Sequence, residues 1–261
     1  MNYSHIISDM TWSYSRITTY EECPYRFYLK YIRNVKGTRH FFADYGSFMH
    51  LIIQKYLIGE LKRGELADYY LINFRKNVVG KAPNPKIFDN YFRQGLDYLT
   101  SIRDFNGKIL SVEEEVNFKL ESVSFTGFID VVFVSDRNGW INLADNKSRN
   151  LKQRSTKRKP TKSDEELDRY LRQLYIYSVP IEQKYGVFPK LLIFNCFRTK
   201  TLIQEPFDIK AYKATKEWAL STIDIISNTS TWNPNIDWFK CSYICDCNRQ
   251  CEYFQMFGGD T

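Results

Sequence analysis

The run Val123–Ser135 (VSFTGFIDVVFVS) constrains the fold more than any other part of the sequence, because it is apolar on both of its faces. Successive side chains of a β-strand point to opposite sides of its sheet. A strand that is apolar on both sides needs protein packed above and below it, as in the centre of a sheet with helices on its faces. The run therefore predicts a buried central strand in a layered fold.

Alternating and helical patterns surround this run. Residues 112–120 alternate between apolar and polar side chains, as do residues 140–147 after a turn signal at 136–139, so three strands in succession predict an antiparallel meander. We also expect helices at residues 15–32, 46–64, 67–104 (interrupted by a loop at 80–85), 165–185 and 209–226, and strands at 190–197 and 202–207. The sum is an α/β fold: a mixed sheet flanked by helices, with a helical N-terminal part.

Length and composition fit this architecture. A chain of 261 residues with 43% apolar side chains can bury a sizeable core, and we expect a single domain over residues 1–261. Its parts would be a mainly helical region at 1–105, the sheet with its helices at 106–230 and a cysteine-rich segment at 231–261. The net charge of +7 favours a polyanionic partner. The sequence shows neither a signal peptide nor a membrane span, which predicts a soluble, cytoplasmic protein.

Asp130 is the anomaly in the central run, where its neighbours are Ile129, Val131 and Val132. A lone ionised carboxylate there would cost several kcal/mol unless a cation or strong donors compensate for its lost hydration. One alternative is that Asp130 lies at an exposed end of the strand or bonds to a turn. The other alternative is that groups elsewhere in the fold form a site with Asp130 and compensate for its buried charge.

The next strand supplies such groups, because Asp145 and Lys147 are two residues apart and share one face. If the two strands pair through the short turn, Asp130 can lie opposite Asp145. Two converging carboxylates can hold Mg²⁺, which prefers oxygen ligands. A neighbouring lysine can orient or deprotonate a water, or stabilise charge on a phosphate. The alternative is an ordinary Asp–Lys surface pair.

At this point the sequence resembles the PD-(D/E)XK nucleases, specifically the RecB-like branch whose members carry an iron–sulfur cluster. The similarity spans nearly the whole chain and rests on several elements that occur in the family's order. These are SYSRITTYEECPYRFYLKYI at Ser13–Ile32, the G-x-x-x-H element at Gly46–His50, the G-x-I-D element at Gly127–Asp130, Asp145-Asn146-Lys147 as D-x-K, and the Q-x-x-x-Y element at Gln173–Tyr177. The resemblance implies a restriction-endonuclease-like core.

The resemblance also implies a set of site residues. Asp130 and Asp145 would be metal ligands and Lys147 the catalytic lysine, with His50 and the backbone carbonyl of Asn146 as further ligands. An imidazole among carboxylates suits Mn²⁺ somewhat better than Mg²⁺.

The resemblance also implies that Gln173 and Tyr177, which lie on one helix face, line the active site and contact the substrate strand. The alternatives are a packed helix histidine at position 50 and an ordinary amphipathic contact at positions 173 and 177. Either Glu113 or Glu115 would match an acidic position on the preceding strand, and the sequence does not choose between them.

Four cysteines crowd into the segment 241–251, at Cys241, Cys245, Cys247 and Cys251. In a reducing compartment such spacing is typical of metal binding. The resemblance implies a [4Fe–4S] cluster held by Cys23, Cys241, Cys245 and Cys251, with the choice among the C-terminal cysteines left open. A Cys₄ zinc site is the competing interpretation. Cys196 is expected to be a buried core thiol.

A basic segment at residues 147–162 carries eight Lys and Arg residues and no acidic one. We expect a loop or mobile lid that binds phosphates, against the alternative of a solvated surface run. Tyr170, Tyr175 and Tyr177 could stack on unpaired bases or belong to the core.

The resulting hypothesis is a metal-dependent DNA exonuclease that hydrolyses phosphodiester bonds at single-stranded ends, in recombination, repair or phage DNA processing. The alternative is an iron–sulfur DNA-binding or recombination-assembly protein with little or no turnover. An RNA-processing enzyme shares the charge pattern, but no further feature supports it. The chain has no G-x-x-x-x-G-K-[ST] motif, so unwinding would require a separate helicase or recombination partner.

Overall fold

A five-stranded mixed sheet forms the centre of the computed structural model, which describes residues 3–256 and 258. The strands are β1 (Gly107–Leu120), β2 (Val123–Ser135), β3 (Ile141–Lys147), β4 (Leu191–Cys196) and β5 (Thr201–Pro206), and they lie in this order across the sheet. Neighbouring strands are antiparallel except for β3 and β4, which are parallel. This arrangement confirms the predicted mixed sheet and α/β class.

Strand β2 is covered on both faces, as its sequence requires. Val132 packs in the core beside Leu143 of β3, whereas Val131 and Phe133 pack on the other face with Ala144. The β2–β3 register sets Val132 against Leu143 and Val131 against Ala144. Continued by one residue, this register brings Asp130 to the level of Asp145, as the sequence predicts.

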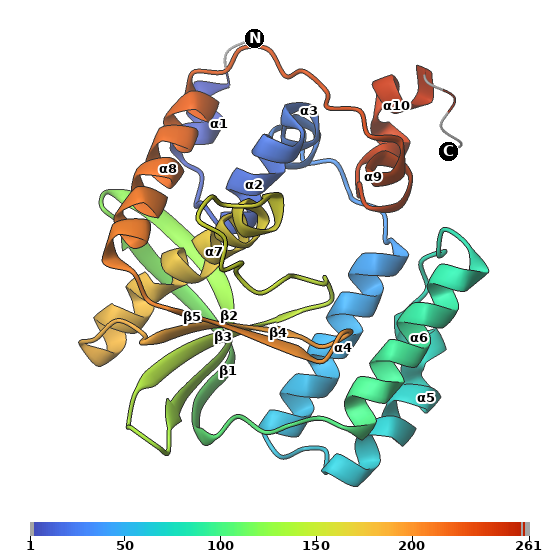
Figure 1. Cartoon of the computed structure of the whole chain (residues 1–261). Coiled ribbons are helices and arrows are strands. Elements are labelled where there is room, and N and C mark those ends of the chain that lie inside the picture. The colour runs from blue at the N-terminus through green and yellow to red at the C-terminus, as the bar shows by residue number, and fades with distance from the viewer. Residues whose placement is uncertain (1–2, 257, 259–261) are drawn as a thin grey trace.

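Helices cover the two faces. On one side α7 (Lys162–Tyr185) contacts β1, β3 and β4, and α8 (Ile209–Ser227) packs against α7 (Figure 1). On the other side α4 (Phe41–Leu57) contacts β1 and joins α5 (Leu66–Asn77) and α6 (Pro85–Thr100) in a helical part with its own aromatic core. Within the described residues, no helix is both long enough and apolar enough to cross a membrane.

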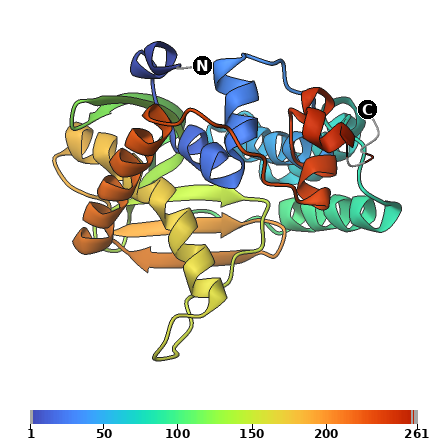
Figure 2. The ribbon, with the colours of Figure 1, turned by 90° about the horizontal axis from the view of Figure 1, so that it is seen from above.

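Short helices form the two ends of the described chain. The first part contains α1 (Ser4–Ser8), α2 (Tyr14–Glu22), α3 (Pro24–Phe27) and a π-helical turn (Tyr28–Ile32), and the last part contains α9 (Trp238–Tyr243), a 3-10 turn (Asn248–Gln250) and α10 (Glu252–Met256). A further 3-10 turn (Arg63–Glu65) precedes α5. Asp246 pairs with Arg26 at 2.9 Å and Lys30 at 2.6 Å, so the last part lies against the first (Figures 1 and 2).

The predicted single helix at 15–32 is wrong, because the chain breaks at Cys23. This residue is extended, with φ −162° and ψ 105°, and the proline that follows disfavours a helical conformation there. Its Sγ instead accepts the N–H of Arg26 at 3.4 Å and caps α3. The helix expected from residue 46 starts at Phe41, so Gly46 lies inside α4 rather than before it. Strand β1 is also longer than expected and begins at Gly107.

Candidate active site

The fold brings the predicted catalytic and metal-ligating side chains to one pocket of about 890 Å³. Strands β2 and β3, which are neighbours, supply the carboxylates and the lysine, while α4 and α7 approach from opposite faces of the sheet. The predicted residues that line the pocket are His50, Asp130, Asp145, Asn146, Lys147, Gln173 and Tyr177.

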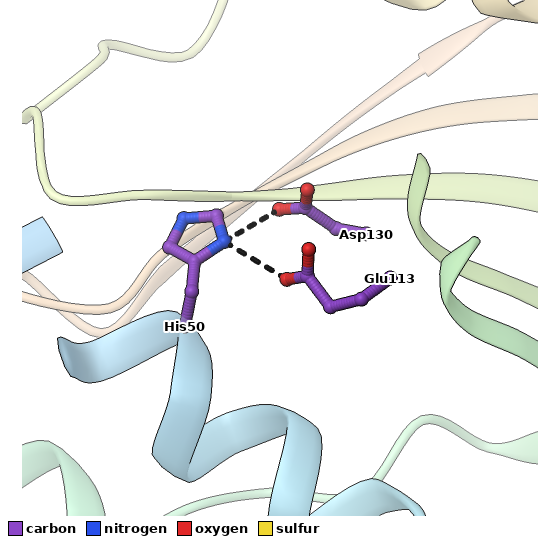
Figure 3. A group of neighbouring side chains, drawn as sticks. All are labelled: His50, Glu113 and Asp130. Atoms are coloured by element: carbon purple, nitrogen blue, oxygen red, sulfur yellow. Dashed lines mark hydrogen bonds and ion pairs between the residues drawn. The ribbon is translucent and has the colours of Figure 1, made fainter. Parts of the chain in front are cut away.

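His50 is the centre of a compact group of ligand atoms. Its Nδ1 lies 3.1 Å from Oε1 of Glu113 and 3.3 Å from Oδ2 of Asp130, as Figure 3 shows. Its Nε2 lies 2.8 Å from the carbonyl oxygen of Asn146. One ligand atom each from His50, Glu113 and Asp130 falls within 4.8 Å of the other two. Three side chains and a main-chain carbonyl thus present the oxygen and imidazole donors that Mg²⁺ and Mn²⁺ accept.

Glu113 is the member of this group that the sequence left undecided against Glu115. Its backbone is left-handed, with φ 48°, inside strand β1. Pairing with β2 is regular on both sides, with Val112 opposite Val131 and Glu114 opposite Ile129. A left-handed non-glycine residue costs about 1–3 kcal/mol and persists where the surroundings enforce it. Here it accompanies a carboxylate that points at His50.

The electrostatics of this group follow from crowded negative charge. Burial and the neighbouring charge of Asp145 raise the pKa of Asp130 to about 7. Burial alone would lower the pKa of His50, but its hydrogen bond with Glu113 and the charge of Asp130 raise that pKa to about 9. The pocket thus favours positive charge at the point where the carboxylates converge.

Asp145, Lys147 and Gln173 form a second, contiguous group. Lys147 Nζ lies 2.8 Å from Oδ2 of Asp145 and donates to Oε1 of Gln173 at 2.8 Å. Gln173 in turn donates to Oδ1 of Asp145 at 2.9 Å. Burial opposes the charge on Lys147, but Asp145 raises its pKa above the usual value, so the side chain is a cationic donor. The three groups hold one another in fixed orientations.

Tyr177 lies beneath strand β2 rather than in the open part of the pocket. It is 7% exposed, and a Cβ at Gly127 would come within 2.5 Å of its hydroxyl oxygen. Only glycine at position 127 allows this close approach. The contact between Tyr177 and Gly127 therefore sets the distance between helix α7 and strand β2, which carries Asp130.

The aromatic residues that face open space differ from those expected. Tyr175 is 5% exposed and does not line the pocket, so of the two alternatives left open by the sequence it takes the core position. Tyr170 does line the pocket, and Lys147 Nζ lies 5.7 Å from the centre of its ring.

A larger aromatic wall comes from three separate helices, with Phe42 on α4, Tyr91 on α6 and Phe239 on α9. The ring centres of Phe42 and Tyr91 are 5.2 Å apart, and those of Phe42 and Phe239 are 6.0 Å apart. The Arg198 guanidinium lies 3.4 Å from the centre of the Tyr91 ring. The pocket thus has a charged half and an aromatic half. The sequence could not show this wall, because its members are far apart along the chain.

The basic segment is a loop, one of the two expected alternatives, and ion pairs hold part of it. Ser148, Arg149 and Asn150 line the pocket, but the segment then runs outward beyond the start of α7 (Figure 2). Arg154 pairs with Asp168 at 2.7 Å and with Glu205 at 2.8 Å. Besides Arg154, the exposed basic residues beyond the pocket are Lys152, Lys157, Arg158, Lys159 and Lys162.

Cys23 joins the four C-terminal cysteines around one small cavity. The sulfur of Cys23 accepts hydrogen bonds from the N–H groups of Arg26 and Asn235, both at 3.4 Å. A tetrahedral zinc site, with Zn–S near 2.3 Å, requires sulfurs about 3.8 Å apart. In the described part of the chain, no three cysteine sulfurs come within 4.8 Å of one another. The described cysteines therefore do not form a preassembled four-sulfur zinc site.

Cys247 differs from the other cysteines of this cavity. Its side chain is fully buried and its thiol lies 3.8 Å from Oδ1 of Asp246, to which it donates. Burial and the Asp246 charge raise its pKa to about 12. Burial raises the pKa values of Cys241 and Cys251, and the proximity of each to Cys23 contributes to the rise. This geometry favours Cys247 as the spare thiol. Cys196 is buried in the core.

Comparison with known proteins extends these observations. A family model described as the PD-(D/E)XK nuclease superfamily matches residues 11–252. Curated proteins give no match. A solved structure from Eubacterium rectale, whose name records a provisional assignment as an exonuclease, is 14% identical. That match covers 99% of this chain and 97% of the other, with a TM-score of 0.52, and shows a shared fold. The structure of SSO0001 is 17% identical over 94% of this chain and 87% of that one, with a TM-score of 0.38.

Proposed function

This chain belongs to the PD-(D/E)XK nuclease superfamily, and we propose that it is a metal-dependent DNA exonuclease that hydrolyses phosphodiester bonds at single-stranded ends. One observation supports the proposal: His50 and Asp130 line one pocket together with Asp145, Lys147 and Gln173, and the carboxylate of Glu113 contacts His50 from outside this lining. Ligands for a cation and a fixed ammonium donor are the two components that phosphodiester hydrolysis needs.

The site residues have different roles in the proposed reaction. His50, Glu113, Asp130, Asp145 and the carbonyl of Asn146 would hold Mg²⁺ or Mn²⁺, which supplies Lewis acidity and a nucleophilic water when bound. Lys147 donates a hydrogen bond to a phosphate oxygen and stabilises the negative charge that develops there. Gln173 fixes the position of the Lys147 ammonium relative to the Asp145 carboxylate, because its side chain forms a hydrogen bond with each of them.

The aromatic half of the pocket favours an unpaired strand as substrate. Bases in a duplex stack on each other, whereas the bases of a single strand are free to stack on Phe42, Tyr91 or Phe239. Such stacking contributes about 1–3 kcal/mol per base and tolerates any sequence. Arg149 and Arg198, which also line the pocket, can contact the backbone phosphates of the same strand.

We further propose a [4Fe–4S] cluster at Cys23, Cys241, Cys245 and Cys251. The convergence of Cys23 with the C-terminal cysteines on one cavity and the N–H donors to the Cys23 sulfur support this proposal. Such a cluster would join α3 to α9, and α9 carries Phe239 of the aromatic wall. Its role in this proposal is structural: it holds the wall against the pocket.

The biological setting would be recombination, repair or phage DNA processing, with a separate helicase or recombination protein supplying single strands. The second candidate is an iron–sulfur DNA-binding protein without turnover. The intact group of Asp130, Asp145 and Lys147 favours the enzyme over this candidate.

Incubation with 5′- and 3′-labelled linear single strands, linear duplexes and circular single strands tests the proposal. Each substrate is combined with Mg²⁺, Mn²⁺ or EDTA. The proposal expects metal-dependent shortening of the linear single strand, with the circle left intact. Cleavage of the circle would show an endonuclease, and binding without cleavage under every condition would favour the second candidate.

A further inference from the structure

A second pocket, of about 450 Å³, lies on the sheet face opposite α7. It has no lining residue in common with the candidate active site. Phe133, Asn142, Ile193 and Asn195 come from strands β2, β3 and β4, and the segment that follows α6 closes one side. Its volume lies in the range of pockets that bind small molecules, which are typically about 300–1,000 Å³.

The pocket has an aromatic lining. The rings of Phe105 and Phe133 lie 4.9 Å apart at an angle of 39°, and Tyr98 lies beside them in the lining. Ile193 and Leu191 extend this apolar surface along β4. A planar, partly apolar ligand could pack on these side chains.

Amide side chains gather around this apolar surface with unused hydrogen-bonding capacity. Asn142 is 2% exposed, and its Nδ2 donates to the carbonyl of Trp140 at 3.0 Å. Its Oδ1 has no partner among the described residues. Buried polar atoms without a partner are uncommon and point to a missing group. Within the same described part, the side-chain amides of Asn106 and Gln204, which also line the pocket, make no hydrogen bond.

Two arginines provide positive charge in the lining. Arg103 and Arg137 are exposed, and neither forms an ion pair or a hydrogen bond through its side chain with any residue that the structure describes. Lys200, by contrast, is engaged by Asp97. Guanidinium groups bind phosphates through paired N–H donors.

We propose that this pocket binds a nucleoside monophosphate. The base lies on Phe105 and Phe133, the amides of Asn142 and Gln204 contact its edges, and Arg103 and Arg137 bind the phosphate. Asparagine and glutamine amides are matched to the donor and acceptor pattern of a base edge. The proposal concerns a site separate from the candidate active site and does not require nuclease turnover.

Asn195 is unsuitable for testing this site. Its Nδ2 donates to Tyr98 Oη at 2.7 Å and to Asn146 Oδ1 at 2.8 Å. Asn146 lies in the candidate active site, so a change at Asn195 would disturb both pockets. Arg103, Arg137 and Gln204 lack such a connection and provide the test variants.

Isothermal titration of the full chain in EDTA measures the binding. The ligands are dAMP, dCMP, deoxyadenosine and inorganic phosphate, and the variants are Arg103→Ala, Arg137→Ala and Gln204→Ala. Arg75→Ala is the matched control, because Arg75 is an exposed arginine outside the pocket. Lys147→Ala reports any binding at the candidate active site. Melting curves confirm that each variant is folded.

We expect saturable binding of one monophosphate per chain. Arg103→Ala, Arg137→Ala and the loss of the phosphate group should each weaken it about tenfold, as expected for a lost charge-assisted hydrogen bond. Arg75→Ala and Lys147→Ala should bind like the parent protein. Three results would overturn the proposal: no saturable binding at millimolar ligand, binding that depends on Lys147, or inorganic phosphate binding as tightly as dAMP.

Discussion

The main-chain N–H of Asn146 donates a 2.7 Å hydrogen bond to Oδ2 of Asp130. The same oxygen lies 3.3 Å from Nδ1 of His50. The carboxylate of β2 is therefore held by the backbone of β3, between the two residues of that strand, Asp145 and Lys147, that complete the site. The geometry of the site depends on how these strands pair, rather than on flexible side chains alone.

The first prediction concerns Lys147. Lys147→Ala should lower the rate of DNA cleavage by about a thousandfold or more, because charge stabilisation in a buried site contributes several kcal/mol to a barrier. Circular dichroism and the melting temperature should show a folded protein. Cleavage at the parental rate by the purified variant would remove Lys147 from the proposed site.

The second prediction separates two neighbouring glutamates. Glu113→Gln should weaken Mn²⁺ binding, measured by titration calorimetry, and slow cleavage, because it removes a carboxylate 3.1 Å from His50. Glu115→Gln is the matched control, since Glu115 is exposed on the same strand and lies outside the ligand group. Equal effects of the two variants would show that Glu113 is not a ligand.

The contrast between Asp130 and Glu113 shows what the sequence could predict. Asp130 stands out because it interrupts an apolar run, and Asp145 and Lys147 share a strand face by simple alternation. The meander of the first three strands and the approach of Asp130 to Asp145 therefore follow from local pattern. Glu113 does not, because its left-handed backbone departs from alternation, and the string of three glutamates at 113–115 offers no way to choose.

Contacts between segments that are distant along the chain could not be predicted from the sequence either. Nothing local marks Phe42, Tyr91 and Phe239 as one wall, since each also fits an ordinary amphipathic helix. For Tyr175 the sequence left open whether the side chain stacks on bases or belongs to the core, and the structure packs it against Phe207 in the core. Position on a helix indicates a face, and only tertiary packing decides what that face meets.

The third prediction concerns the cysteines. Anaerobically purified protein should be brown and contain about four iron atoms per chain. Cys23→Ala should lose the colour and the iron, whereas Cys247→Ala should keep both, because the Cys247 thiol is protonated and donates a hydrogen bond to Asp246. Iron analysis and visible absorption measure the result. A colourless parent protein with one zinc per chain would establish the competing interpretation, and iron loss in Cys247→Ala would make Cys247 a ligand.

The fourth prediction compares two kinds of basic residue in the segment 147–162: those without an ion pair among the described residues, and Arg154, which has two. Neutralising Lys152, Lys157, Arg158 and Lys159 should weaken single-strand binding for every sequence and reduce the slope of log affinity against log salt by about 0.7 per lost contact. Arg154→Gln should change that slope less, because Asp168 and Glu205 already bind its guanidinium. Binding isotherms at several salt concentrations decide the matter. Parallel slopes for the parent and the four-site variant would exclude phosphate contacts by this segment.

The fifth prediction is a pH dependence of stability at Asp164. Hydrogen bonds from Ser155 and Thr161 lower the pKa of this carboxyl well below its usual range. Its stabilising contribution is therefore complete above about pH 4, the value for an unfolded Asp, and declines as the pH falls from there toward the lowered folded value. Urea midpoints of the parent and Asp164→Asn should differ at pH 7 and converge in acid. A difference that stays constant with pH would contradict this account.

The place of Phe239 in the aromatic wall has a consequence for how the enzyme is made. While the chain emerges from the ribosome, residues 1–230 can assemble the sheet and bring His50, Asp130 and Lys147 together. Helix α9 follows the whole sheet in the chain, and the ion pairs of Asp246 with Arg26 and Lys30 hold the segment that contains α9 against the first helices. A nascent chain can therefore contain the charged half of the pocket before Phe239, which completes the aromatic half, has been synthesised.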